Sequence, residues 1–503
     1  MNAMSNTTSY TKPHYFSIDL ISFFLQIMEK LLTFILLGLV FVSTAESRDH
    51  KSFKEQIPYS AINCRKHIAY LTDFGGKGDG VTSNSAAFKA AVANLSKVAS
   101  DGGALLVVPP GKWLTGSFGL ASHFTLYIHQ KAVILASQEE SDYPLIDPLP
   151  SYGSGREAPG KRFSSLIVGT NLTDVVVTGG NGTIDGQGEI WWKKFKAKKL
   201  KHTRPYLIEI LHSTHLQISD LTLTNSPSWH IHPTYCSNVI LERLTILAPV
   251  DVPNTDGINP DSCTDTRIRD SYVVSGDDCI AVKSGWDHHG INYAKPTQRL
   301  SIRGFTCISP KSALIALGSE MSGGIRDVRA EGLRALNSES GIRIKTGVGR
   351  GGYVKDIYVR DAEMYTMKYV FWMNGDYGGH PDTGFDPKAL PEITNINYRD
   401  MVAKNVKIVG ALSGIKGDAF TNICISNVTV ALENKEKNKE KRFFIGEEKG
   451  KKLPWNCTDV GGVSSKVTPK ACPELVEKEV DCAFPTDTLA IDKVKLNQCF
   501  VNV

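Results

Sequence analysis

A recurring pattern of short apolar segments constrains the fold of this chain more than any other feature of its sequence. From Val175 onward, segments such as THLQISDLTL, SNVILERLTI and TNICISNVTV alternate apolar and polar residues. Alternation with a period of two residues predicts β-strands, and the recurrence of whole segments predicts stacked repeat units. Aligning the segments places eight residues at equivalent positions, namely Leu216, Val239, Thr266, Leu300, Val328, Ile357, Ile396 and Ile423.

The length of the repeat favours one architecture. Most steps between successive aligned positions are 23 to 34 residues long, and one step is 39 residues. A unit of this size cannot bury its own apolar face, so we expect an all-β chain that forms one right-handed parallel β-helix, with neighbouring coils about 4.8 Å apart. An antiparallel sandwich also uses many short strands, but its hairpin turns return roughly every 8–12 residues, and the sequence lacks that spacing.

The segments on either side of the repeats predict caps. A helix-like run begins at Ser85, and we expect it to cap the start of a β-helix domain that spans residues 48–432. Residues 433–503 begin with the charged stretch ENKEKNKEKR, which predicts a solvated loop. Four of the ten cysteines follow this loop, which suggests a C-terminal cap held by disulfides. They are Cys457, Cys472, Cys482 and Cys499.

Residues 1–47 predict targeting rather than globular structure. Residues 31–42 form a twelve-residue apolar run followed by small residues, as in a secretion signal. The run is short for a membrane span, which needs about 20 apolar residues, although a second apolar patch at residues 18–28 leaves an uncleaved anchor as the alternative. An even number of cysteines and five downstream glycosylation sequons agree with secretion. We therefore expect an extracellular monomer that contacts a membrane only if this segment is uncleaved.

Three aspartates stand close together within the repeats. Asp256 precedes Asp277 by 21 residues and Asp278 by 22 residues, which is close to the shorter repeat steps. The three residues should therefore lie at nearly the same angular position on consecutive coils. Adjacent side chains of a regular strand point to opposite faces, so Asp277 and Asp278 can share one groove only if the backbone bends, which Gly276 permits.

Crowded carboxylates suit acid–base chemistry. Mutual repulsion should raise the pKa of at least one of them, so that an acid lies beside a base. Hydrolysis of a glycosidic bond with inversion needs such a pair, separated by about 6.5–9.5 Å, and we expect one coil step plus side-chain reach to fit that window. Arg343 and Lys345 lie two residues apart on one strand face, where they suit either a carboxylated sugar or structural ion pairs with the acids.

The motifs that carry these residues are NTDG at 254–257, GDDC at 276–279 and RIKT at 343–346. Their order and spacing, within a similarity that runs from about residue 71 to residue 430, resemble those of the polygalacturonases, β-helical enzymes that hydrolyse pectin. The resemblance implies that Asp277 is the general acid and that Asp256 and Asp278 hold the attacking water. It also implies that Arg343 and Lys345 bind the substrate carboxylate.

The same resemblance implies further residues of the site. Tyr377 in NGDYGG is the expected counterpart of a tyrosine found in the family, and Asn254, the first residue of NTDG, is expected at the substrate site. Cys279 and Cys307 match a pair that bridges neighbouring coils in relatives. The family implies no cofactor and no metal.

The chain departs from the family pattern at one place. Polygalacturonases usually carry a GHG before a GS pair, which places a histidine beside the catalytic acid. The corresponding stretch here, SPKSALIALGS at residues 309–319, has Lys311, Ser312 or Ala313 in that place. Acid–base groups typically contribute a factor of about 10²–10⁴ in rate, so the loss predicts slower catalysis or a different pectic substrate.

Other segments give weaker signals. Trp229 and His230 precede Asp256 by about one coil, and this position is equally compatible with substrate contact and with a structural role. The lysine-rich residues 191–204 predict a solvated loop more than a rim for an acidic polymer, and a secreted protein is not expected to bind nucleic acid. Pectate lyases share the β-helix and hold Ca²⁺ with clustered aspartates, but the order of the motifs favours a hydrolase.

Together these features predict a secreted enzyme that hydrolyses the α-1,4-galacturonosyl links of pectin, an acidic polysaccharide, with inversion and without a cofactor. A net charge of +5 tolerates such a partner without requiring one. Two alternatives stay open. One is a hydrolase of rhamnogalacturonan or xylogalacturonan, which the missing histidine supports, and the other is a weakly active or inactive wall protein that binds pectin.

Overall fold

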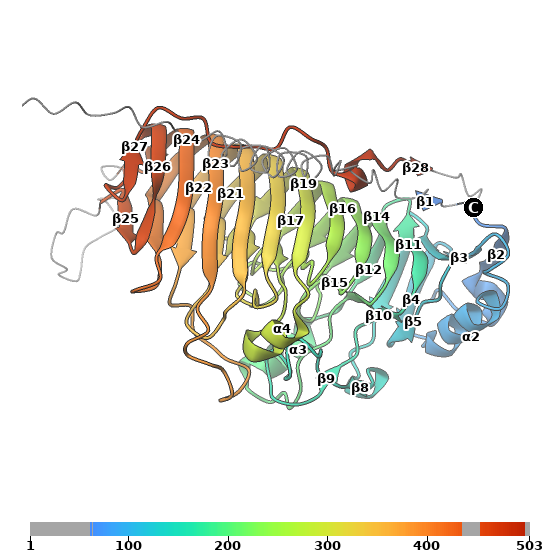
Figure 1. Cartoon of the computed structure of the whole chain (residues 1–503). Helices are drawn as coiled ribbons and strands as arrows, with labels where there is room; N and C mark the ends of the chain where they lie inside the picture. The colour runs from blue at the N-terminus through green and yellow to red at the C-terminus, as the bar shows by residue number, and fades with distance from the viewer. Residues whose placement is uncertain (1–60, 63, 435–452, 498–503) are drawn as a thin grey trace, which may run out of the picture. The chain divides into compact units, whose positions relative to one another are not determined.

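The computed structural model describes residues 61–62, 64–434 and 453–497, which lie within one compact unit. The expected secretion signal, its alternative as an anchor, most of the charged loop and Cys499 lie outside these residues. No helix in the described ranges is long and apolar enough to cross a membrane. Parallel strands dominate the described chain and stack along one axis (Figure 1).

Eight long strands form the central part of the β-helix, and each pairs in parallel with the next one. They are β14 (Thr214–Thr224), β16 (Ser237–Leu247), β17 (Thr264–Val274), β19 (Thr297–Ile308), β21 (Ile325–Lys345), β22 (Tyr353–Asn374), β23 (Glu392–Ser413) and β24 (Phe420–Leu432). Every residue aligned from the sequence pairs with the next aligned residue, from Leu216 with Val239 to Ile396 with Ile423. The predicted right-handed parallel β-helix and its register are therefore confirmed.

Shorter strands complete the earlier coils and form a second face. The earlier coils contain β2 (His67–Tyr70), β3 (Ala104–Val108), β4 (Gly111–Thr115), β6 (Phe124–Ile128), β7 (Ala132–Ala136), β11 (Thr173–Gly179) and β12 (Gly182–Asp185). The second face contains β5 (Phe118–Gly119), β10 (Ile167–Thr170), β13 (Ile208–Leu211), β15 (Ile231–Thr234), β18 (Ile280–Val282) and β20 (Ala313–Leu317). Between them, Ile258 bridges Ile231 of β15 to Ile280 of β18, and Asp261 bridges Thr234 of β15 to Lys283. The site described below lies along this second face.

Alternation along each strand produces a continuous core column. Ile218 pairs with Leu241, and the row continues through buried residues on each following coil. Its further members are Ile268, Ile302, Ala330, Val359, Tyr398 and Ile425. Residues that pair in register, and residues two positions apart on one strand, point into the same interior. Full burial of a large apolar side chain contributes about 1.5–3 kcal/mol, so each coil is stabilised by its two neighbours.

Two columns of left-handed residues bend the strands into coils. A left-handed residue lies one position before each aligned residue: His215, Asn238, Asp265, Arg299, Asp327, Asp356, Asn395 and Asn422, with φ of 51–57°. Another lies four positions after it: Asp220, Arg243, Asp270, Gly304, Gly332, Asp361, Asp400 and Asn427, with φ of 46–63°. Glycine, asparagine and aspartate adopt this conformation at the lowest cost. Their recurrence in the sequence explains how one strand turns a corner without a separate loop.

Short helices lie at the end and on one side of the coils. The helix predicted from Ser85 is α2 (Ser85–Leu95), which caps the first coils by stacking Phe88 on Phe118 with ring centroids 4.3 Å apart. The lysine-rich stretch predicted as a solvated loop begins instead in α3 (Glu189–Lys196), because its adjacent tryptophans, Trp191 and Trp192, are buried against the coils.

The solenoid continues beyond the predicted boundary at residue 432. β25 (Trp455–Thr458) pairs with β23, and β26 (Val460–Thr468) pairs with β24 and with β27 (Leu475–Glu477), all in parallel. Two disulfides fasten this region, Cys457–Cys472 and Cys424–Cys482. The bridge that the family resemblance implied between neighbouring coils, Cys279–Cys307, is confirmed.

The C-terminal tail runs back along the outside of the β-helix (Figure 1). Arg267 of β17 donates from Nη1 to the carbonyl oxygens of Ile491 at 3.0 Å and Val494 at 2.8 Å. The tail ends in β28 (Leu496–Asn497), which pairs in parallel with β1 (Ala61–Ile62). One arginine in the central coils therefore holds a segment that lies more than 200 residues away in sequence.

We expect Arg267→Met to destabilise the protein by about 1–3 kcal/mol, because the substitution leaves two tail carbonyl oxygens without their donor. Unfolding in urea, followed by circular dichroism, measures the change. Arg334→Met is the matched control, since Arg334 forms an exposed pair with Glu363 whose contribution should be below about 1 kcal/mol. A loss no larger than that of the control would mean that Arg267 does not hold the tail.

Candidate active site

Two aspartates occupy equivalent positions on consecutive coils. Ile258 forms a parallel bridge with Ile280, and Asp256 and Asp278 each lie two residues before these partners. The N–H of Gly257 donates to the carbonyl oxygen of Asp278 at 3.0 Å, which holds the two turns side by side. The register of the coils therefore brings these two carboxylates together.

Asp277 joins them because the backbone bends between the end of β17 and the start of β18. At Gly276 an added Cβ would lie 2.0 Å from the carbonyl oxygen of Val252, so only glycine allows this close approach. The N–H of Asp277 donates to Ser275 Oγ at 3.0 Å, and the N–H of Asp278 donates to Asp277 Oδ1 at 2.9 Å. As a result, Asp277 and Asp278 line the same pocket as Asp256.

The spacing of the carboxylates differs from the expectation. One carboxylate oxygen from each of Asp256, Asp277 and Asp278 lies within 4.8 Å of the other two. The nearest oxygens are thus closer than the separation of about 6.5–9.5 Å typical of inverting glycosidases, and the predicted fit to that window is wrong. The reason is that equivalent positions on consecutive coils are separated by only the strand spacing, about 4.8 Å, and aspartate side chains are short.

Asp256 has the character of an acid. It is 3% exposed, and burial together with the charge of Asp277 raises its pKa well above the usual value. Lys283 opposes this shift, and Asn259 Nδ2 donates to Asp256 Oδ2 at 3.2 Å. The raised pKa expected in this cluster therefore belongs to Asp256, whereas the family resemblance implies Asp277 as the general acid.

Asp278 has the character of a base. It is 1% exposed, and burial alone would raise its pKa. The Lys345 ammonium, which donates to Asp278 Oδ2 at 2.5 Å, and the Ser312 hydroxyl instead hold the pKa below its usual value. The N–H of Ala313 donates to Asp278 Oδ1 at 3.1 Å. Two carboxylates on neighbouring coils thus have opposite tendencies to hold a proton, which is the arrangement that acid–base catalysis needs.

The stretch that lacks the family histidine still contacts the aspartate cluster. The sequence left Lys311, Ser312 and Ala313 as alternatives for the place of that histidine, and the structure puts the Ser312 hydroxyl on Asp278 Oδ1. The carbonyl oxygen of Ser312 accepts the N–H of Ser340 at 3.1 Å, which fixes the turn. The departure from the family pattern therefore leaves Asp278 with a hydrogen-bond donor on this side.

Asn254 positions Asp277. The backbone N–H of Asn254 donates to Asp277 Oδ2 at 3.0 Å, and its side-chain Nδ2 lies 3.5 Å from the same oxygen. Arg204, which the sequence analysis did not identify, donates from Nη2 to Asn254 Oδ1 at 2.9 Å. Asn254 also lines the pocket, as expected for the substrate site.

The two predicted cations have different surroundings. Lys345 is engaged in the ion pair described above, which is the structural alternative to substrate binding. The Arg343 guanidinium lies 3.6 Å from the ring centre of Trp372 and 5.6 Å from that of Tyr377, and Glu339 is 3.8 Å from its Nη1. Its buried Nε has no hydrogen-bond partner within the described residues. Arg343 therefore retains donor capacity for an anionic ligand.

Two aromatic residues accompany these cations. Tyr377 lines the pocket, as the resemblance implied. Trp372 was missed by the sequence analysis, although a signal was present. It pairs with Arg343 in the register of β21 and β22, so advancing Arg343 by one repeat of 29 residues would have found it.

Trp229 and His230 are placed differently from each other. Trp229 lines the pocket, but it is 4% exposed and stacks on Tyr206 with ring centroids 4.7 Å apart. His230 is fully buried, its Nδ1–H donates to the Asp256 carbonyl oxygen at 3.0 Å, and its Nε2 accepts the N–H of Ser226 at 3.4 Å. Burial lowers the pKa of His230 to about 4. Of the two roles left open for His230, its burial favours the structural one, because the imidazole supports the backbone beneath Asp256.

A buried charge network on the wall of the pocket also escaped the sequence analysis. Lys283 Nζ donates to Glu320 Oε2 at 2.8 Å, and Arg156 Nε donates to Glu320 Oε1. Burial opposes ionisation of Glu320, but the two cations hold its pKa well below the usual value. The network joins Arg156 to a residue 164 positions away, and no local pattern indicates such a contact.

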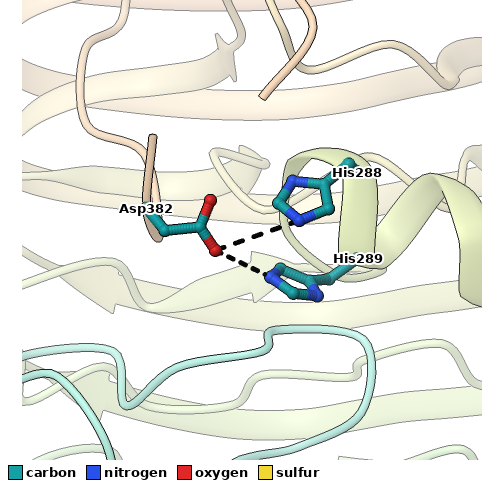
Figure 2. Close-up of side chains that lie close together, drawn as sticks. All are labelled: His288, His289 and Asp382. Atoms are coloured by element: carbon teal, nitrogen blue, oxygen red, sulfur yellow. Dashed lines mark hydrogen bonds and ion pairs between the residues drawn. The ribbon is translucent and has the colours of Figure 1, made fainter. Parts of the chain in front are cut away.

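The aspartate cluster fits a calcium ion poorly. Calcium prefers six to eight oxygen ligands, several of them ionised carboxylates. Asp278 is already neutralised by Lys345, and Asp256 has a raised pKa. A second group of close side chains lies on α4 (Asp287–Tyr293), where His289 Nε2 and His288 Nε2 are 3.0 and 3.9 Å from Asp382 Oδ2 (Figure 2). This group holds the segment around Asp382 against α4.

We expect Ser312→Ala to destabilise the protein by about 1.5–3 kcal/mol at pH 7, because it removes a hydrogen bond to an ionised carboxylate. The lowered pKa of Asp278 contributes stability above its unfolded pKa of about 3.9, and this contribution is lost as the pH falls through the folded pKa. The loss should therefore be smaller at pH 3 than at pH 7.

Urea unfolding at both pH values measures this difference. Ser301→Ala is the matched control, because Ser301 is buried and its hydroxyl has no partner within the described residues. A loss for Ser312→Ala that does not change with pH would show that the hydroxyl does not act on the charge of Asp278.

Comparison with known proteins identifies the family. Residues 151–443 match the profile of glycosyl hydrolases family 28. The chain is 59% identical to a probable polygalacturonase of Vitis vinifera over 95% of both chains, and 28% identical to a polygalacturonase of Malus domestica over 71% of both. Among solved structures, an exopolygalacturonase from Thermotoga maritima matches with a TM-score of 0.64 and 26% identity, over 75% of this chain and 91% of that one. A Yersinia enterocolitica family 28 exopolygalacturonase shares the fold, with a TM-score of 0.63 and 18% identity over 79% and 78% of the two chains. The chain belongs to glycosyl hydrolase family 28 and is a glycosidase.

Proposed function

We propose that this protein is an extracellular polygalacturonase that hydrolyses the α-1,4-galacturonosyl bonds of pectin with inversion. The observation that carries the proposal is a pocket in which an acidic and a basic aspartate lie on neighbouring coils, beside two cations suited to a carboxylated sugar. The names of the plant relatives support the same activity. Three disulfides in the described residues support an oxidising, extracellular environment, and the plant relatives support a role in the plant wall. We also expect a monomer.

The acid is Asp277, the residue that the family resemblance implies. It lines the same pocket as Asp256 and Asp278. Asp277 is the most accessible of the three aspartates, and its position is fixed by Asn254. In the reaction the proton passes to the oxygen of the leaving sugar, and the glycosidic bond breaks.

The base is Asp278, with Asp256 helping to hold the attacking water. Lys345 and Ser312 keep Asp278 ionised, so it accepts a proton as the water oxygen attacks the anomeric carbon. Asp278 and Asp256 are both buried and hydrogen-bonded, which suits holding a water better than direct attack on carbon. Water as the nucleophile gives inversion, even though the nearest oxygens are closer than in most inverting enzymes.

Arg343 binds the carboxylate of the sugar that lies on the side of the cleaved bond facing the later coils. Its guanidinium has an unpartnered Nε, lies against Trp372 and Tyr377, and pairs with none of the three described aspartates. Lys345 contributes charge to the same region while it holds Asp278. The missing histidine was the main support for a hydrolase of rhamnogalacturonan or xylogalacturonan, and in that stretch the Ser312 hydroxyl supplies a hydrogen-bond donor to Asp278.

We expect Asp277→Asn to lower kcat on polygalacturonate by about 10²–10⁴, the usual contribution of a general acid. The loss should be far smaller on an aryl galacturonide whose phenol leaves without protonation. Asp278→Asn should lose activity equally on both substrates, because both need the base. Proton NMR of the first product should show the β-anomer.

Circular dichroism should show that these variants retain the fold. If the aryl substrate restores the activity of Asp256→Asn but not that of Asp277→Asn, the acid has been assigned to the wrong residue. An α-anomer as the first product would contradict inversion. Binding of polygalacturonate without release of reducing ends would identify an inactive pectin-binding protein, and a preference for another pectic polymer would identify the alternative hydrolases.

We expect Arg343→Ala to raise KM for polygalacturonate by about 10–100-fold with little change in kcat, since it removes a hydrogen bond to a charged group. Lys345→Ala should also lower kcat and move the acidic limb of the pH profile to higher pH, because Lys345 no longer lowers the pKa of Asp278. Lys355→Ala, an exposed lysine paired with Glu392, is the control. Equal effects of Arg343→Ala on polygalacturonate and on its methyl ester would remove the role of Arg343 in carboxylate binding.

A further inference from the structure

A long excursion from the β-helix contributes two residues, Arg156 and Glu157, to the lining of the pocket. Residues 147–161 leave the coils between β8 (Leu145–Ile146) and β9 (Arg162–Phe163), whose antiparallel pairing closes the base of the excursion. We call residues 147–161 the strap. The strap ends just before β10 in the sequence, yet its side chains contact several later coils.

The strap is anchored firmly. The hydroxyls of Ser151 and Tyr235 are 2.6 Å apart, Tyr152 Oη donates to Asp261 Oδ2 at 2.5 Å, and the N–H of Trp286 donates to the Ser151 carbonyl oxygen at 2.8 Å. Each contact lies on a different coil. The anchor also includes a buried apolar cluster separate from the main core, made of Leu149, Tyr152, Tyr235 and Trp286.

The last part of the strap forms a wall of the pocket. Glu157 Oε2 accepts Arg204 Nε at 2.9 Å, and Glu157 Oε1 accepts the Ser228 hydroxyl at 3.0 Å. Arg156 donates across the pocket to Glu320. Arg204 and Ser228 belong to the two coils that precede Asp256, so Glu157 stands at the N-terminal end of the pocket.

The surface beyond this wall is covered. Ile208 pairs with Ile231, and Ile231 bridges Ile258. Two residues before these positions lie Tyr206, Trp229 and Asp256, which are therefore equivalent on three consecutive coils. Tyr206 and Trp229 line the pocket with the aspartates, but they are only 5% and 4% exposed, so no open groove runs along them. Glu157 contacts Arg204 and Ser228 on the same two coils, so the strap closes the pocket there.

The opposite side is open within the described residues. On the coils after the aspartates, Arg343 lies over Trp372, and Trp372 lies against Tyr369 with ring centroids 4.5 Å apart. Trp372 and Tyr369 are half-buried, and the neighbouring Lys368 is exposed. Aromatic rings and cations thus continue in the direction in which an acidic polysaccharide could extend. The pocket is therefore closed at one end and open at the other.

We propose that the strap restricts this enzyme to chain ends, from which it removes one galacturonate at a time, and that Arg156 binds the carboxylate of that terminal sugar. The inference rests on the proposed function and specifies its mode of attack. The pocket between Asp256 and the wall at Glu157 spans two coil steps at most, about 10 Å, which accommodates one sugar ring with its carboxylate but no continuing polymer. The side chain of Arg156, which is 31% exposed, and the Lys283 ammonium supply positive charge in that space.

The products formed early from polygalacturonate test the mode of attack. Monogalacturonate should be the only early product, and the viscosity of the polymer should fall slowly relative to the release of reducing ends. A mixture of oligogalacturonides with a rapid fall in viscosity would overturn the inference while leaving the proposed function intact. No hydrolysis of any galacturonan would overturn the proposed function instead.

Arg156→Ala tests the terminal contact. We expect KM for trigalacturonate to rise by about 10-fold or more, because a charged hydrogen bond to the substrate is lost. Lys161→Ala is the matched control, since Lys161 lies on the strap but forms an exposed pair with Asp147. A KM for Arg156→Ala that equals the control value would show that Arg156 does not bind the terminal sugar. Thermal unfolding of both variants would show that the strap remains anchored.

Discussion

The in-register stacking of parallel coils is the constraint on which the rest of this structure depends. Each coil buries its inward row against the rows above and below, so a shift of register would move apolar side chains out of the column. The same register pairs Ile258 with Ile280 and thereby places Asp256 beside Asp278. The fold thus sets the separation of the reacting groups at about the strand spacing of 4.8 Å.

Stacking equivalent acids on one another has an electrostatic cost, and later coils offset it. Lys283 and Lys345 lie on coils at and beyond the aspartates, and each forms a buried ion pair, with Glu320 and Asp278 respectively. Because Lys345 forms its ion pair with Asp278 rather than with Asp256, the two equivalent carboxylates acquire opposite tendencies to hold a proton. The division into acid and base therefore arises from the asymmetry of the surrounding cations rather than from the aspartates themselves.

The coils and the excursions between them contribute different properties. The aspartates and Arg343 lie on the rigid coils, where neighbouring strands fix their positions. Arg156 and Glu157 lie on the strap, an excursion that adds no strand to the main sheet but decides how a polymer reaches the aspartates. Many enzymes divide these tasks in the same way: a rigid scaffold holds the catalytic groups, and loops control access to them. It allows the mode of attack to change while the chemistry is retained.

The sequence by itself determined the strand register and the position of the three aspartates, because both follow from local alternation and a repeat length. It also indicated Arg343 and Lys345, and the resemblance supplied Tyr377 and the Cys279–Cys307 bridge. Only the tertiary structure decided that the carboxylate oxygens are closer than expected, that Ser312 and Lys345 hold Asp278, and that His230 is buried. It alone revealed the wall formed by Arg156 and Glu157. These features depend on side chains that meet across several coils, or across 164 residues of chain in the case of Arg156 and Glu320, and such contacts leave no periodic signal in the sequence.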